Sequence, residues 1–186
     1  KSYSNVFHAN GGNASFSVMA NTLRGVYGTD VLLATANSFT GSVLQADYTK
    51  KLAASMIMPN GLMSRQRTMT GAELKETVRA FVEGCEGGFV PFNRGSLPVV
   101  SGIAVEVKEA GGSYTLTGIT RNGQPLRDDD TVTVTCLATS KQMEALLADK
   151  SGIPTDGDAW VKDTWRDYVS GGGAVLAEPE NYMTLR

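Results

Sequence analysis

Asp30-Val31-Leu32-Leu33-Ala34-Thr35-Ala36-Asn37-Ser38-Phe39-Thr40-Gly41-Ser42-Val43 is the stretch that decides how this chain folds. Its first seven residues form a short and almost entirely apolar run, which is typical of a buried strand. Polar and small residues follow at once, as they do in a loop at a strand end. We therefore predict a buried strand over 30–36 that presents Asn37 at its end.

Two amphipathic helices are indicated on either side of this strand. Apolar residues recur at helical spacing from Phe16 to Tyr27, with Asn13 in the position of an N-cap. This first helix is expected to end near Gly25 to Gly28. Thr70 and Glu73 have the spacing of a capping box, which predicts the start of a second helix. The apolar side of each helix is expected to face the core.

The second half of the chain carries the signals of antiparallel strands. Alternating residues over 103–107 and 114–117 flank Gly111-Gly112, which predicts a hairpin. Arg121-Asn122-Gly123-Gln124 is a second turn signal, and Thr131 to Ala138 alternates as a strand does. Several hairpins beside helices favour a layered α+β domain over a doubly wound parallel sheet.

Two further helices are predicted towards the C-terminus. Thr139 with Gln142 can cap a helix whose apolar residues include Met143 and Leu146. Asp156 to Ser170 is the last predicted helix, and it carries both tryptophans of the chain. At their spacing we expect both rings in the core or in a domain contact rather than in a ligand platform.

Length and charge exclude several classes of function. A chain of 186 residues with 41% hydrophobic residues is expected to form one domain with a sizeable core. The formal net charge is −2 with both signs interspersed, so neither a nucleic-acid partner nor an anionic membrane surface is expected. A spanning helix would need about 18 consecutive apolar residues, which the sequence lacks. The chain begins at Lys1, so we expect it to be part of a longer protein.

The metal-binding and thiol residues are few. Cys85 and Cys136 are the only cysteines, and two thiols make neither a disulfide framework nor a zinc site. His8 is the only histidine, whereas a two-metal hydrolytic site draws on several ligands. We therefore expect no cofactor in this chain and no hydrolysis of phosphate esters by it alone.

Several segments follow one another in the order of a known family. They are Asn13–Ala34, Ala36–Val43, Thr49–Gly61, Met69–Lys75, Val99–Ile103 and Gly118–Val134. In order and spacing they resemble the C-terminal domain of the 5′-nucleotidase family. The resemblance implies a single layered domain over 1–186 with helices outside the sheets. It also implies an N-terminal metallophosphoesterase domain in cis that holds divalent metal ions, and an extracellular, periplasmic or cell-surface location.

The resemblance also implies where the substrate binds. In that family an Asn-x-Gly-x-x-Arg-Gly loop presents an Asn and an Arg to the substrate, and two aromatic rings sandwich the nucleobase. Here Thr40 stands in the place of the Arg, while Asn60 and Cys136 stand in the places of the rings. The implied substrate-binding residues are Asn37, Ser38, Phe39, Thr40, Asn60 and Cys136, and none is catalytic.

These replacements predict weak nucleotide binding. Stacking of a base on an aromatic ring contributes about 1–3 kcal/mol. Without both rings and the Arg we expect AMP to bind in the millimolar range, worth about 4 kcal/mol or less. Residues that could compensate are Arg65, Arg67 and Arg94 for the phosphate and Phe89 and Phe92 for the base.

Two functions are compatible with these residues. The chain is either the substrate-recognition domain of an exported 5′-nucleotidase-like metallophosphoesterase, or a non-catalytic binding or scaffold module that has kept the fold and lost nucleotide recognition. The same fold can serve both.

Overall fold

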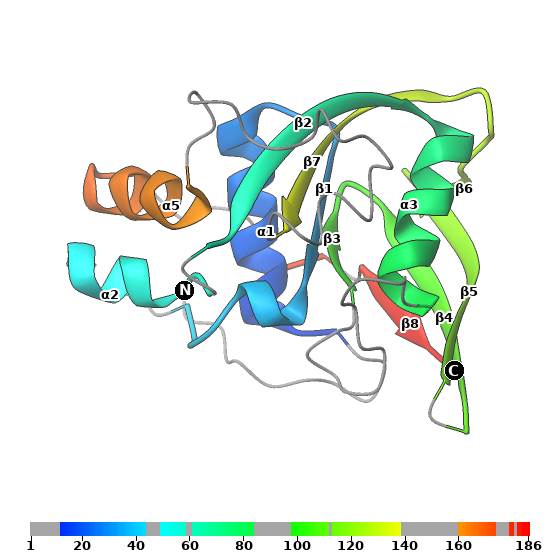
Figure 1. The fold of residues 1–186 in the computed structure, drawn as a ribbon, viewed down its shortest axis with the longest axis horizontal. Coiled ribbons are helices and arrows are strands. Elements are labelled where there is room, and N and C mark those ends of the chain that lie inside the picture. The colour runs from blue at the N-terminus through cyan, green and yellow to red at the C-terminus, as the bar shows by residue number, and fades with distance from the viewer. Residues whose placement is uncertain are drawn as a thin grey trace.

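A computed structural model describes residues 12–43, 49–58, 61–83, 98–111, 113–138, 160–173, 179–180 and 182–186. Within them the strands form two four-stranded sheets, against which the helices pack (Figure 1). The strands are β1 (Val31–Thr35), β2 (Met63–Thr70), β3 (Pro98–Ser101), β4 (Ala104–Ala110), β5 (Ser113–Arg121), β6 (Gln124–Pro125), β7 (Thr131–Ala138) and β8 (Met183–Leu185). The helices are α1 (Ala14–Tyr27), α2 (Lys50–Ser55), α3 (Gly71–Glu83) and α5 (Val161–Ser170), with a 3-10 turn η1 (Ala36–Ser38). The predicted α+β class is confirmed.

The first sheet has the strand order β2-β7-β1-β3. Strand β1 runs parallel to β7 and antiparallel to β3, and all five of its residues are buried. The predicted buried strand is therefore confirmed, although it is one residue shorter at each end. β2 was not predicted, because its polar residues and its position at the sheet edge give no apolar run.

The second sheet has the order β6-β5-β4-β8 and contains the predicted hairpin. Asn122 and Gly123 have φ angles of 52° and 76°, so the predicted turn between β5 and β6 has left-handed residues at its centre. β8 adds in parallel to β4. Gly102 lies between β3 and β4, where the chain passes from the first sheet to the second.

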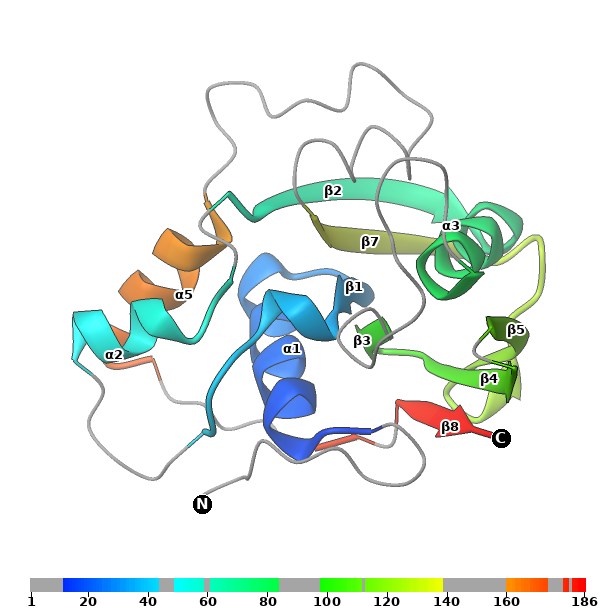
Figure 2. The same ribbon diagram turned by 60° about the horizontal axis from the view of Figure 1, so that its bottom comes forward.

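The caps of the first two long helices confirm the sequence prediction. Asn13 Oδ1 accepts the backbone N–H of Phe16 at the start of α1, and Gly28 ends that helix in the left-handed conformation. At α3, the Glu73 carboxylate accepts the Thr70 N–H at 2.7 Å while Thr70 Oγ1 accepts the Glu73 N–H at 3.2 Å. α1 packs on β1 and β3, and α3 packs on β2, β3 and β5 (Figure 2).

The last helix differs from the prediction. α5 begins at Val161, preceded by Trp160 as a non-helical N-cap with φ −58° and ψ 129°. Trp165 is fully buried, so the core position expected for the tryptophans is confirmed for it. Trp160 is 48% exposed and is not in the core, and the domain contact that was the other expectation stays a prediction for it. The helix predicted to follow Thr139 lies outside the described residues.

Candidate functional site

Three chain segments meet at one end of the first sheet. β1 and β7 are parallel, so their C-terminal ends lie at the same edge, and β2 is antiparallel to β7 and begins there. Leu33 pairs with Cys136 near this edge, and Met63 pairs with Ala138 at it. η1 follows β1 directly in the chain. We call this edge the β1/β7 end. The fold thus brings the predicted loop and the end of β7 together.

The loop after β1 is fixed by the chain between α2 and β2. The Thr40 N–H donates to the Met56 carbonyl at 2.9 Å, and the Met58 N–H donates to the Ser38 carbonyl at 3.0 Å. Phe39 and Ile57 form a β-bridge between these two contacts. Backbone hydrogen bonds of this kind hold the loop in one conformation.

The same loop also contacts α1. Phe39 is 4% exposed, and its ring lies 5.7 Å from the ring of Phe16, measured between centroids. Ser15 Oγ accepts the Val43 N–H at 2.6 Å. Ser38 and Phe39 are therefore buried supports of the loop, Thr40 is half-buried, and the Asn37 residue is exposed.

Cys136 lies in the sheet itself. It pairs with Leu33 on one side and Arg65 on the other and is 1% exposed. Burial raises the pKa of its thiol to about 12, so the thiol is protonated at neutral pH. Arg65 and Arg67 are half-buried in β2. Four further predicted or compensating residues lie outside the described part of the chain: Asn60, Phe89, Phe92 and Arg94.

Trp160 is a residue of this end that the sequence interpretation did not assign to it. It forms a β-bridge with Met63, the first residue of β2, and the Val161 N–H donates to the Leu62 carbonyl at 3.2 Å. Leu62 comes two residues after Asn60 in the sequence. One feature of the sequence could have separated Trp160 from the buried side of α5: it falls outside the i, i+4 spacing of the apolar residues of that helix.

The opposite end of β1 borders a polar cleft of about 330 Å³ between the two sheets. The Asp30 carboxylate accepts the Thr133 N–H at 2.9 Å and forms an ion pair with Arg121 at 2.9 Å. The Thr133 N–H is the main cause of the lowered pKa of Asp30, and Arg121 lowers it further.

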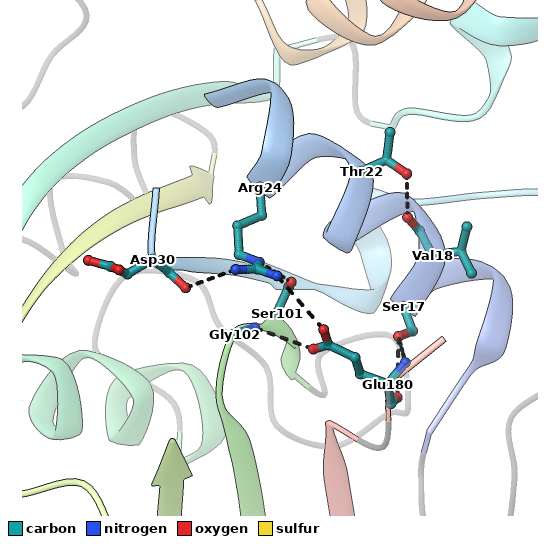
Figure 3. Close-up of polar contacts among 8 residues, drawn as sticks. All are labelled: Ser17, Val18, Thr22, Arg24, Asp30, Ser101, Gly102 and Glu180. Atoms are coloured by element: carbon teal, nitrogen blue, oxygen red, sulfur yellow. Dashed lines mark hydrogen bonds and ion pairs between the residues drawn. The ribbon is translucent and has the colours of Figure 1, made fainter. Parts of the chain in front are cut away.

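Arg24 lines the same cleft from the last turn of α1. Its Nε donates to Ser101 Oγ at 2.7 Å, and its Nη2 lies 3.8 Å from the Glu180 carboxylate (Figure 3). The opposite charges of this cleft are paired across segments far apart in the sequence. The ion pair between Asp30 and Arg121 connects the start of β1 to β5 of the second sheet.

Among the residues that the structure describes, no group of three or more His, Cys, Asp or Glu side chains is placed to hold a metal ion. His8 lies outside them. In the same part of the chain, no helix is long and apolar enough to cross a membrane.

No family model and no curated protein matches the sequence. Among solved structures, the chain is similar to a 5′-nucleotidase precursor from Thermus thermophilus, with a TM-score of 0.70 and 15% identity over 99% of this chain and 38% of that one. The NAD nucleotidase of Haemophilus influenzae gives a TM-score of 0.66 and 16% identity over 100% of this chain and 37% of that one. The chain has the fold of the 5′-nucleotidase C-terminal domain.

This 5′-nucleotidase fold also occurs in a sulfate thiohydrolase from Thermus thermophilus, with a TM-score of 0.60 and 12% identity over 91% of this chain and 31% of that one. The chain therefore spans between about a third and two fifths of the length of these structures. The fold predicted from the resemblance is confirmed, and it places the loop after β1 at a sheet end.

Proposed function

We propose that this chain is the substrate-recognition domain of an exported 5′-nucleotidase-like metallophosphoesterase. The observation that carries the proposal is the match of nearly the whole chain to part of two nucleotide-hydrolysing proteins, at TM-scores of 0.70 and 0.66. In this proposal an N-terminal domain in cis holds the divalent metal ions and carries out hydrolysis. The chain described here binds the nucleotide.

The single histidine of the chain favours this division of labour. Hydrolysis assisted by two metal ions needs clustered carboxylate, imidazole or amide ligands. The described residues supply no such cluster, and the chain has one histidine. They do supply an exposed amide at Asn37, which can both donate and accept hydrogen bonds.

The β1/β7 end is the proposed binding surface for the nucleotide. Its loop is held by the backbone hydrogen bonds from Thr40 and to Ser38, so Asn37 is presented by a fixed turn rather than by a free segment. Preorganisation of this kind lowers the entropic cost of binding. We assign Asn37 and Thr40 to direct contact with the nucleotide, and Ser38 and Phe39 to support of the loop.

Titration of the 186-residue chain with AMP, followed by NMR chemical shifts, tests this function. We expect saturable shifts with a dissociation constant in the millimolar range, worth about 4 kcal/mol. Asn37→Ala should weaken binding, whereas Gln124→Ala, an exposed amide in the second sheet, should not. No saturable binding, or equal binding by both variants, contradicts the proposal and favours a scaffold module.

A second measurement tests the division of labour. The purified chain should release no phosphate from AMP in the presence of divalent metal ions, because it cannot complete a two-metal site. Metal-dependent release that follows the purified chain through size-exclusion chromatography would contradict this assignment.

A further inference from the structure

We propose that the polar cleft at the start of β1 binds a small molecule through a carboxylate group, held by the Arg24 guanidinium and the Gly102 N–H. The cleft has a volume of about 330 Å³ and lies where β1 begins, whereas Asn37 follows the end of that strand. Binding there does not require the nucleotide surface at the β1/β7 end, so it goes beyond the proposed function.

The Arg24 side chain is fixed by a buried partner. Its Nε donates to Ser101 Oγ at 2.7 Å, and Ser101 is fully buried in β3 (Figure 3). The two terminal nitrogens, Nη1 and Nη2, are the donors that Arg24 then offers to the cleft it lines. A guanidinium with a fixed orientation matches the two oxygens of a carboxylate.

The present partners of these two nitrogens are distant. Nη1 lies 3.4 Å from the Asp30 carbonyl oxygen, and Nη2 lies 3.8 Å from the Glu180 carboxylate. Charge-assisted hydrogen bonds are usually about 2.7–2.9 Å long. Arg166 shows closer contacts in the same chain, since its Nε and Nη2 lie 2.7 and 3.0 Å from the Asp167 carboxylate. Arg24 can therefore still bind an anion.

The Glu180 carboxylate indicates where that anion would lie. Its Oε1 faces Arg24 at 3.8 Å, and its Oε2 accepts the Gly102 N–H at 3.4 Å (Figure 3). The backbone N–H of Glu180 donates to Ser17 Oγ at 2.8 Å, which holds the main chain in place. The side chain is 43% exposed, so it can turn towards solvent when a free carboxylate approaches the same two donors more closely.

Gly102 supplies the second donor at a position where no side chain fits. A Cβ there would lie 2.1 Å from the Asp30 carbonyl oxygen and 3.4 Å from Arg24 Cδ. The backbone thus passes directly beside the Arg24 side chain, and one carboxylate can reach both donors.

The second sheet gives the cleft a polar wall. Thr120, Arg121 and Asn122 line it from the end of β5 and the turn that follows. The Asp30 carboxylate is satisfied by Arg121 and by the Thr133 N–H, both at 2.9 Å, so it does not need a cationic group from a ligand. A small hydroxylated carboxylate fits these surroundings better than an apolar one.

Titration of the 186-residue chain with lactate, followed by NMR at the Gly102 amide, tests the site. Lactamide is the control ligand, because it has nearly the same shape without the charge. Lactate should produce a saturable shift of the Gly102 amide, and lactamide should not.

Variants of Glu180 and Arg24 test the competition. Glu180→Gln should tighten lactate binding about two- to fivefold, the change that corresponds to loss of an exposed ion pair. Glu76→Gln makes the same change of charge at an exposed position of α3 and should leave the affinity unchanged. Arg24→Gln should weaken binding about tenfold or more, with far-UV circular dichroism to check that the variant is folded.

Several results would overturn the site. They are the absence of a saturable shift at Gly102, an equal response to lactamide, and equal effects of Glu180→Gln and Glu76→Gln. Tighter binding of inorganic phosphate than of lactate would overturn the assignment to a carboxylate. Failure of AMP to bind contradicts the proposed function alone, and failure of lactate to bind contradicts this cleft alone.

Discussion

Gly102 is a position where one added methyl group should disturb the fold. It connects β3 to β4 with a φ angle of +83°, and a Cβ built there would lie 2.1 Å from the carbonyl oxygen of Asp30. Gly123 has a similar φ angle of +76°, but a Cβ there would meet no atom within 4 Å. Comparison of Gly102→Ala with Gly123→Ala therefore separates two contributions to the free energy of unfolding, that of the left-handed backbone conformation and that of the close contact.

The magnitudes follow from these two geometries. A left-handed conformation costs a residue with a Cβ about 1–2 kcal/mol, and both variants incur it. Gly102→Ala must also push apart two backbone segments, which adds about 1–3 kcal/mol as in other overpacked sites. We therefore expect Gly102→Ala to lower the free energy of unfolding by about 2–5 kcal/mol, and Gly123→Ala by about 1–2 kcal/mol.

Urea unfolding followed by far-UV circular dichroism measures both variants on the same chain. The difference should appear as a lower midpoint for Gly102→Ala with an unchanged slope. Equal midpoints for the two variants would refute the close contact between Gly102 and Asp30, and with it the way in which the two sheets are joined.

Two further predictions concern the helix cap and the Asp30 carboxylate. Thr70→Ala removes the acceptor of the Glu73 N–H and should lower the free energy of unfolding by about 0.5–2 kcal/mol in urea, while Thr68→Ala, an exposed threonine of the same strand, should cost less; equal effects would contradict the capping box. Because the pKa of Asp30 is lowered in the folded state, its stabilisation is present above about pH 4 and is lost as the pH falls below that value. Unfolding free energies measured from about pH 4 downwards should therefore fall less steeply for Asp30→Asn than for the wild type. Asp129→Asn is the control variant. Equal slopes for Asp30→Asn and Asp129→Asn would contradict this prediction.

The sequence alone determined the elements whose signals lie within a few residues of one another. The Asn13 cap, the Thr70 and Glu73 box and the Asn122-Gly123 turn each consist of groups at most four positions apart. Such contacts form wherever the local chain adopts the element, so their residue types reveal them. Strand β7 also has the predicted bounds, and its burial alternates from Thr131 to Val134 before Thr135 to Ala138 are all buried.

The candidate site could be predicted only in part. The position of Asn37 at a strand end follows from the apolar run before it, and the structure places it there. The burial of Cys136 does not follow in this way, because it depends on β1 and β2 pairing on both sides of β7. The resemblance named the position, but not the neighbours that cover it.

Tertiary structure alone decided the arrangement across distant segments. Asp30 and Arg121 are 91 positions apart, and their ion pair exists because β1 and β5 belong to sheets joined at Gly102. The difference between Trp160 and Trp165 has the same origin: both are tryptophans near one helix, but only Trp165 lies on the side that packs into the core. Periodicity along a chain gives the spacing of side chains, whereas burial depends on which other segments pack against them.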